Sequence, residues 1–233
     1  MKSRRSFLLK ALIASPIMVW PHAVSAFLRN ELPDVLILGD SISIGYTPFV
    51  QKFLNGKANV FRPVLEDGKP ENCQGTTNGI AHIDRWIGNR KWNVIHFNFG
   101  LHDLKHVEPD TGANSQNPKH PQQASLKQYK KNLEIITEKL LATDAKLIFA
   151  TTTPYPDVVN GPLRKPGMPK KYNRVAVKIM NKNGILINNL HDFILPRLDD
   201  LQLPANVHFT EEGSRAMALK VVDRINEALE NEL

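Results

Sequence analysis

Ser41 and His208, far apart in the chain, have the side chain types needed for nucleophilic catalysis. Ser41 follows the apolar run 35–38 and the residues Gly39 and Asp40. An apolar run that ends in such a turn predicts a buried strand, and it places the serine at the carboxyl edge of a sheet, where α/β proteins bind ligands. Taken alone, the same residues are also typical of a simple helix cap.

A nucleophilic serine needs a base to accept its proton, and His208 is the histidine best placed to supply it. His208 lies in a loop that leads into the last predicted helix, and this loop can reach the carboxyl edge of the sheet. The histidines at 82, 96 and 191 fall in a predicted helix, inside a predicted strand and near a strand end. We interpret those three as structural.

The elements that must position this pair alternate between strand and helix. Apolar and β-branched runs predict strands at 34–38, 60–64, 92–99, 146–152 and 184–188. Helical spacing predicts helices at 44–54, 80–87, 125–142, 172–183, 191–201 and 211–229. Pro48 must sit in the first helix turn or break it, and Pro63 favours an edge strand. This alternation predicts an α/β fold with a parallel five-stranded sheet and helices on both faces.

Three long polar segments follow predicted strands, at 66–78, 104–124 and 153–169. Loops of this length in a compact domain are typically functional. The last two should flank the site, with His106, His120, Tyr155 and Asn160 available to it. That polarity favours a hydrophilic substrate, such as an acetylated sugar, over a long lipid chain.

Four motifs, in order, resemble the SGNH, or GDSL-like, hydrolase family of bacterial esterases and acyl hydrolases. They are Gly39-Asp40-Ser41, the loop 72–77 with Gly75, Gly100-Leu101-His102-Asp103, and Val207-His208-Phe209-Thr210. The resemblance implies a flavodoxin-like three-layer α/β/α sandwich and ester hydrolysis through an acyl-serine. It implies Ser41 as nucleophile and His208 as base, with the backbone N–H groups of Ser41 and Gly75 at the oxyanion. Asp40 and Asp103 should brace the two turns.

The third motif departs from the family pattern, because His102 occupies the position of an asparagine that donates to the oxyanion. An imidazole N–H can also donate, with a different pH dependence. Alternatively, His102 only packs in its loop, and the oxyanion relies on the backbone donors. Losing one such donor typically costs on the order of a hundredfold in rate.

The last motif also departs from the family pattern, because Ala205 stands where an aspartate normally orients the catalytic histidine. We prefer a Ser-His dyad in which a backbone carbonyl near Ala205 accepts the Nδ1 hydrogen. Asn206 is a second possible partner, and Asp199 or Asp200 is a third. An uncharged partner fixes the tautomer but stabilises the imidazolium less than a carboxylate does.

His102 and His106 are four residues apart, but no third ligand accompanies them, so we expect neither a metal nor a cofactor. The formal net charge of +7 falls to about +3 without residues 1–26, and no basic stripe remains to bind nucleic acid. The glycines at 39 and 45 do not form the G-x-G-x-x-G pattern of a dinucleotide site. Cys73 is the only cysteine, which excludes an intrachain disulfide.

Residues 1–26 are predicted to be an export signal that precedes a single hydrolase domain at 27–233. Paired Arg4 and Arg5 come before an apolar stretch, and small residues precede Phe27. The arginine pair resembles a twin-arginine signal. The apolar stretch is short for a transmembrane helix, so we expect cleavage, a periplasmic or secreted protein and no stable membrane insertion.

The sequence therefore predicts an exported serine esterase that removes a small acyl group from a small-molecule or saccharide ester. A lipase, thioesterase or acyltransferase of the same family remains open. So does a weakly active or inactive relative that binds a ligand. The oligomeric state is open too.

Overall fold

The computed structural model describes residues 31–230, which contain a five-stranded parallel sheet. The strands are β1 (Asp34–Leu38), β2 (Asn59–Phe61), β3 (Val94–Phe97), β4 (Lys146–Ala150) and β5 (Leu186–Asn188). Their spatial order is β2-β1-β3-β4-β5, and every neighbouring pair is parallel. This is the flavodoxin-like order, so the predicted fold class is confirmed.

The central strands β1, β3 and β4 are buried almost throughout. Leu38 lies beside Phe97, and Phe97 lies beside Phe149, in the register of the three strands. Continuous apolar strands of this kind are typical of a sheet that is covered on both faces. β2 is a short edge strand that ends two residues before Pro63, in agreement with the edge position expected for that proline.

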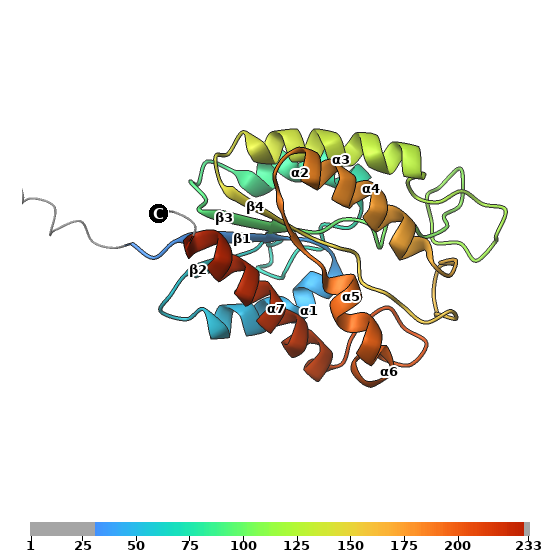
Figure 1. Cartoon of the computed structure of the whole chain (residues 1–233). Helices are drawn as coiled ribbons and strands as arrows, with labels where there is room; N and C mark the ends of the chain where they lie inside the picture. Colours follow the sequence, from blue (N-terminus) through green and yellow to red (C-terminus); the bar gives the residue numbers. More distant parts are fainter. Residues whose placement is uncertain (1–30, 231–233) are drawn as a thin grey trace, which may run out of the picture. The chain divides into compact units, whose positions relative to one another are not determined.

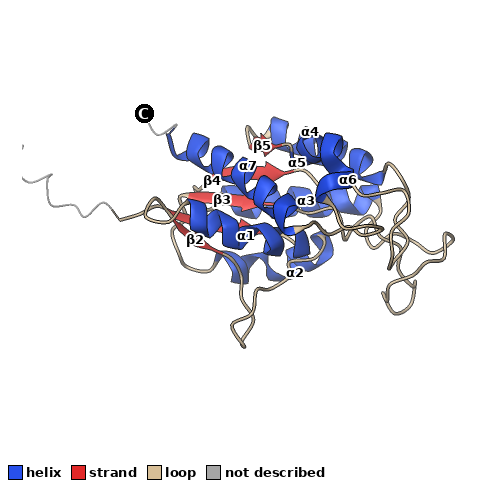
Figure 2. Cartoon of the chain, turned by 90° about the horizontal axis from the view of Figure 1, so that it is seen from below, coloured by secondary structure: helices blue, strands red, loops and turns tan. Residues whose placement is uncertain are grey.

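Helices form one layer on each face of the sheet (Figures 1 and 2). One face carries α1 (Ser41–Phe53), α5 (Leu190–Ile194) and α7 (Glu211–Glu230), and α1 packs along α7. The other face carries α2 (Thr76–Ile87), α3 (Leu126–Leu141) and α4 (Met168–Lys182), packed side by side. These layers make the three-layer sandwich, with its apolar core on both sides of the sheet.

The first helix begins earlier than its apolar spacing predicts, so the expected position of Pro48 is wrong. The Asp40 side chain accepts a hydrogen bond from the Ile42 N–H and caps α1 at Ser41. Pro48 is therefore the eighth residue of the helix and lies in its interior. It is exposed, so its ring does not intrude on the core side of the helix.

Prolines also explain two other shifted boundaries. A further shift involves no proline: α2 begins at Thr76, four residues before the predicted start at 80. α4 begins at Met168, four residues before the predicted start at Tyr172, because Pro169 occupies the first turn, where proline fits a helix well. The predicted helix at 191–201 is divided into α5, the 3-10 helix η3 (Leu195–Arg197) and α6 (Leu198–Leu201). Pro196 lies in η3, at the point of division.

The two long loops that follow β3 and β4 are joined to each other beyond the carboxyl edge of the sheet. The Leu163 N–H donates to the Ser115 carbonyl at 2.7 Å, and the His106 N–H donates to the Leu163 carbonyl at 2.9 Å. Two antiparallel bridges, His106 with Gln122 and Val107 with Asn114, close the first loop on itself. Backbone hydrogen bonds thus give both loops a defined conformation.

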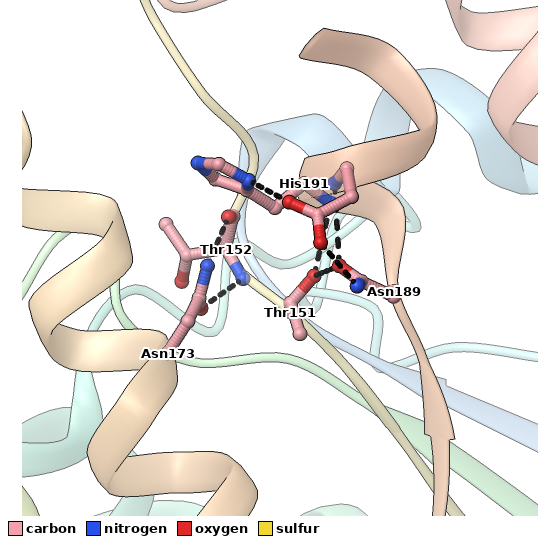
Figure 3. Close-up of polar contacts among 6 residues, drawn as sticks. Thr151, Thr152, Asn173, Asn189 and His191 are labelled. Carbon is pink, nitrogen blue, oxygen red and sulfur yellow. Dashed lines mark hydrogen bonds and ion pairs between the residues drawn. The ribbon is translucent and has the colours of Figure 1, made fainter.

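A polar network anchors the start of the second loop (Figure 3). The Asn173 amide of α4 donates to the Thr152 carbonyl and accepts from the Thr152 N–H, both at 2.8 Å. The Thr151 hydroxyl accepts from the His191 N–H at 2.9 Å and donates to the Asn189 side chain at 3.2 Å. Residues from α4 and from the start of α5 therefore fix the chain where β4 ends.

The predicted export signal at 1–26 lies outside the described residues, and its cleavage stays a prediction. Within residues 31–230, no helix combines the length and apolarity that crossing a bilayer requires.

Candidate active site

Ser41 and His208 meet at the carboxyl edge of the sheet. Ser41 is the first residue of α1, directly after the turn that follows β1. His208 comes from the loop between α6 and α7, and its Nε2 lies 2.9 Å from Ser41 Oγ. The Thr210 hydroxyl donates to the Leu201 carbonyl and accepts from the Gly213 N–H, which fixes the end of this loop at the start of α7. The two residues are thus within hydrogen-bond distance, as a nucleophile and its base must be.

Asn206 is the partner of His208 on the other side of the ring. Its Oδ1 lies 2.8 Å from His208 Nδ1 and also accepts from the His208 backbone N–H at 3.1 Å. This arrangement gives His208 the tautomer in which Nδ1 carries the hydrogen and Nε2 can accept one from Ser41.

The preferred contact with a backbone carbonyl near Ala205 is not formed. Ala205 has a φ of 49°, in the left-handed region, and its carbonyl accepts the Asn160 N–H at 2.9 Å. Asp199 and Asp200 lie on α6, and within residues 31–230 neither is hydrogen-bonded to His208. Of the three alternatives, the geometry matches Asn206.

Burial, and secondarily the positive charge of Arg164, lower the pKa of His208 below its ordinary value of 6.5. The imidazole is therefore neutral, and able to accept a proton, at neutral pH and somewhat below it.

Asp40 braces the turn that presents Ser41. The carboxylate is only 1% exposed, and its Oδ1 accepts from the Ile42 N–H at 2.9 Å. The Asp40 carbonyl also accepts from the Ser43 hydroxyl at 2.7 Å. Burial raises the pKa of Asp40 to about 6. These contacts match the expected bracing role, and none of them joins Asp40 to His208.

Gly75 is the residue before α2, and its loop is tied to the turn before Ser41. The Cys73 N–H donates to the Gly39 carbonyl at 3.1 Å. A Cβ at Gly75 would lie 3.0 Å from Asp103 Oδ2 and 3.1 Å from its Cγ, so a larger residue there would press on the Asp103 carboxylate. The backbone N–H groups of Ser41 and Gly75 donate to no other residue among 31–230, which leaves both available to an oxyanion.

Asp103, the residue that packs against Gly75, also binds the first residue of α2. Its Oδ1 accepts from the Thr76 N–H at 2.8 Å and from the Thr76 hydroxyl in a short hydrogen bond. The side chain is fully buried, and burial raises the pKa of Asp103 to about 6. Asp103 therefore links the turn after β3 to the loop that contains Gly75.

His102 precedes Asp103 and is close enough to His208 for a charge on the His208 ring to disfavour protonation of His102. Burial lowers the pKa of His102 to about 3, with smaller contributions from Lys105, Arg164 and His208. Its Nδ1 is buried and has no hydrogen-bond partner within residues 31–230. The ring is therefore neutral at any pH well above 3, and a neutral imidazole carries one N–H. A donor role for His102 would thus add no pH dependence near neutral pH.

Two of the polar residues expected to line the site hold the loops instead. His106 Nδ1 lies 2.7 Å from the His120 carbonyl, and the Tyr155 hydroxyl donates to the Lys165 carbonyl at 2.9 Å. Asn160 supports the His208 loop through Ala205, as described above. Within the described range, no three His, Cys, Asp or Glu side chains form a group that could hold a metal.

The sequence reasoning missed Arg164, which lies in the loop after β4 and is only 7% exposed. It is near enough to Asp40, His102 and His208 to influence the pKa of each. A single arginine within a proline-rich loop carries no motif, so only the folded chain reveals this position.

Comparison with known families finds one matching family model, the GDSL-like Lipase/Acylhydrolase family, over residues 37–216. That range includes all four motifs around Ser41, Gly75, His102 and His208. A comparison with curated proteins finds no match.

Several solved structures share the fold at low identity. An acetyl xylan esterase, AlAXEase, is 16% identical with a TM-score of 0.64, over 82% of this chain and 99% of that one. The lipase/acylhydrolase from Enterococcus faecalis is 18% identical with a TM-score of 0.63, over 84% and 96%. A variant of Axe2, an acetyl-xylooligosaccharide esterase from Geobacillus, is 14% identical with a TM-score of 0.61, over 83% and 94%.

The family match spans most of the chain, and the matched segments meet at one edge of the sheet. The chain therefore belongs to the GDSL-like lipase/acylhydrolase family.

Proposed function

We propose that the protein is a serine esterase that forms an acyl-serine intermediate at Ser41. The observation that carries the proposal is the aligned set Ser41 Oγ, His208 and Asn206, with contacts of 2.9 Å and 2.8 Å. The pair of unused backbone N–H groups at Ser41 and Gly75 supports it, because an ester carbonyl needs such donors as it becomes an oxyanion.

In the first half of the reaction, Ser41 Oγ attacks the ester carbonyl carbon while His208 Nε2 takes the hydroxyl proton. The negative charge that develops on the carbonyl oxygen is stabilised by the Ser41 and Gly75 N–H groups and by the His102 ring N–H. The tetrahedral intermediate collapses, and the bond to the alcohol breaks. His208 returns its proton to the departing alkoxide, which leaves the acyl group on Ser41.

In the second half, water replaces the alcohol. His208 takes a proton from the water as its oxygen attacks the acyl carbon. The second tetrahedral intermediate then expels Ser41 Oγ, which recovers the proton from His208. Asn206 holds the ring in the required tautomer throughout, and Asp40 and Asp103 hold the two turns.

The substrate we propose is a small acyl ester, most simply an acetyl ester, of a hydrophilic alcohol such as a carbohydrate. The polar loops at 104–124 and 153–169 beside the site support this class. Two of the solved relatives are named as esterases that act on acetylated xylan or xylooligosaccharides, which makes acetylated saccharides the natural first substrates to test.

The test is to compare hydrolysis of p-nitrophenyl esters from acetyl to long-chain acyl groups, and of an acetylated xylooligosaccharide, by the wild type and by Ser41→Ala. We expect acetyl esters to have the highest kcat/KM and the variant to lose activity by on the order of 10⁴-fold or more. A preference for long acyl chains would contradict the substrate class. Equal activity in Ser41→Ala would contradict the nucleophile.

We also propose that residues 1–26 direct export through a twin-arginine route and are then removed. The Arg4-Arg5 pair and the small residues before Phe27 support this proposal. The expected mass of the exported protein is that of a chain beginning at Phe27. Replacing both arginines with lysine should leave the precursor uncleaved in the cell. Unchanged export of that variant would contradict the route.

A further inference from the structure

Arg164 is a buried cation without a carboxylate partner. Its side chain is 93% shielded from solvent, at a relative exposure of 7%. Its Nε donates to the Leu101 carbonyl at 3.3 Å, and within residues 31–230 it forms no ion pair. The charge of the buried Asp40 carboxylate acts on Arg164 without forming an ion pair with it, and burial outweighs this attraction and lowers the pKa of Arg164. Burying a guanidinium that no carboxylate contacts costs free energy, so the position calls for a reason beyond stability.

The two terminal nitrogens of Arg164 are without a hydrogen-bond partner in the described part of the chain and are not sealed from solvent. With Nε occupied, the Nη1–Nη2 end of the fork remains able to donate to two oxygens of one anionic group.

The residues on either side hold Arg164 in place. Leu163 donates to the Ser115 carbonyl and accepts from the His106 N–H. The Lys165 carbonyl accepts from the Tyr155 hydroxyl at 2.9 Å. The network at Thr151 and Thr152 fixes the start of the same loop (Figure 3). A guanidinium held on a braced loop loses little entropy when it binds a ligand.

A second cation, Lys105, lies close to Arg164. Burial lowers the pKa of Lys105 most, the positive charge of Arg164 lowers it further, and the Asp103 carboxylate acts in the opposite direction. Lys105 also forms no ion pair within residues 31–230, and its loop is tied through the Gln123 N–H, which donates to the Lys105 carbonyl at 2.8 Å. An anion bound between two neighbouring cations would offset their mutual repulsion.

The position of the two cations relates them to the proposed reaction. Arg164 Nε donates to the carbonyl of Leu101, the residue before His102, and the Lys105 N–H donates to the His102 carbonyl at 3.3 Å. The charges of both cations act on His102, and that of Arg164 also acts on His208. An anion bound to them would therefore lie beside the ester at Ser41.

We propose that Arg164, assisted by Lys105, forms a subsite for an anionic group of the substrate, a carboxylate or a phosphate close to the ester that Ser41 attacks. The inference rests on the proposed esterase function and names its substrate class: an acyl ester of an acidic molecule. Arg164 is then the residue that determines specificity for the acidic ester.

Three acetyl esters of similar size test the subsite: acetoxyacetate, which carries a carboxylate, acetoxyethyl phosphate, and the neutral methyl acetoxyacetate. The measured quantity is the ratio of kcat/KM for each acidic ester to that for the neutral one. We expect the wild type to prefer at least one acidic ester by about tenfold or more, the scale of one charge-assisted contact. The ester with the higher ratio identifies which anion the subsite takes.

Arg164→Gln should reduce this ratio about tenfold, mainly through KM, and Lys105→Gln should reduce it less. Arg164→Lys keeps the positive charge but lacks the two terminal guanidinium nitrogens, so it should retain part of the preference for the acidic ester. Arg174→Gln is the matched control, because it removes the same charge from an exposed position on α4 and should leave the ratio unchanged. A wild type without acidic preference, or an unchanged ratio in Arg164→Gln, would overturn the inference.

Binding to Ser41→Ala, measured by calorimetry, separates this inference from the proposed function. If the wild type hydrolyses none of the esters, the esterase proposal fails, but acetoxyacetate or acetoxyethyl phosphate should still bind Ser41→Ala and bind more weakly when Arg164→Gln is added. Equal binding of the neutral and acidic esters to Ser41→Ala would overturn the subsite whatever the result for hydrolysis.

Discussion

At the scale of single residues, Asn206 gives His208 an uncharged hydrogen-bond partner where the family usually has a carboxylate. The amide fixes the ring, with 2.8 Å between Oδ1 and Nδ1, but it adds no negative charge to stabilise an imidazolium. Burial and Arg164 push the pKa of His208 in the same direction, toward the neutral ring. His208 is therefore neutral, and able to accept a proton, below its ordinary pKa of 6.5. Its neighbours do little to stabilise the imidazolium that forms when it accepts that proton.

The variant Asn206→Asp tests this description. A carboxylate at the same position favours the charged ring, so the pKa of His208 rises. Because His208 must be neutral to accept a proton, the acid limb of kcat/KM against pH, which lies below 6.5 in the wild type, moves to higher pH. At a pH above the acid limbs of both the wild type and the variant, kcat should rise about tenfold or more. The reason is that a carboxylate beside Nδ1 stabilises the imidazolium that forms in the transition state.

Asn206→Ala is the matched control for this substitution, and it should lower kcat without moving the acid limb upward. Identical pH profiles for the Asp and Ala variants would show that Asn206 does not act on the ring.

Residue chemistry in the sequence was enough to single out Ser41, Gly75, His102 and His208, because each lies in a short motif. The partner of His208 could only be narrowed to three alternatives. Asn206 is favoured because the left-handed backbone at Ala205 turns its carbonyl to Asn160, a contact 45 positions away that local sequence does not encode. Arg164 was missed for the same reason, since its neighbours come from three separate segments.

At the scale of elements, the start of α2 is positioned by a contact between two loops. Gly75 packs against the Asp103 carboxylate, and Thr76 donates to the same group. A methyl group at Gly75 would meet Asp103 Oδ2 at 3.0 Å, so the Asp103 carboxylate or the start of α2 must shift by a few tenths of an ångström.

We expect Gly75→Ala to lower kcat on the order of a hundredfold, the usual loss when one oxyanion donor is displaced. KM should change much less, because the ground-state ester needs that donor less than the transition state does. Circular dichroism and thermal unfolding establish that the variant folds. A folded variant with kcat within about threefold of the wild type would contradict the assignment of the Gly75 N–H to the oxyanion.

Periodicity predicted the existence and order of the strands and main helices, but not the exact ends of several elements. Those ends depend on particular side chains. Asp40 starts α1 early, Pro169 suits the first turn of α4, and Pro196 divides the segment before His208. A capping residue or a proline sets a helix end within two or three residues. A helical apolar pattern can be recognised only over at least one full turn, so it places that end less precisely.

At the scale of the whole molecule, the parallel sheet brings together segments that are up to 167 positions apart, because all its strands end at one edge. The same sheet encloses His96, a strand residue of β3 that contacts the Asn188 amide at 3.2 Å. Burial lowers the pKa of His96 from 6.5 to about 3. Folding therefore keeps this histidine neutral at a pH where the unfolded chain binds a proton.

The consequence is a loss of stability in acid. Between pH 6.5 and about 3, the unfolded state binds one more proton at His96 than the folded state, so the free energy of unfolding falls by about 1.4 kcal/mol per pH unit. Asp40 and Asp103 act in the opposite direction. Their folded pKa values of about 6 lie above the ordinary 3.8, so the folded state gains stability as they are protonated.

Chemical denaturation of the wild type and of His96→Asn at pH 6.5 and pH 5 isolates the histidine, since the other groups are common to both proteins. The variant is expected to be less stable at both values but to lose about 2 kcal/mol less than the wild type between them. Equal losses in the two proteins would mean that His96 is protonated in the folded state.

The most direct test of the central claim is covalent labelling of the mature protein with a fluorophosphonate, followed by mass mapping of the adduct. An activated Ser41 should be labelled between pH 6 and 9, where the lowered pKa of His208 leaves its ring neutral. Labelling should be lost in His208→Ala and retained in Arg174→Gln. Absence of labelling throughout this range, or labelling at another serine, would contradict the assignment of Ser41 as the nucleophile.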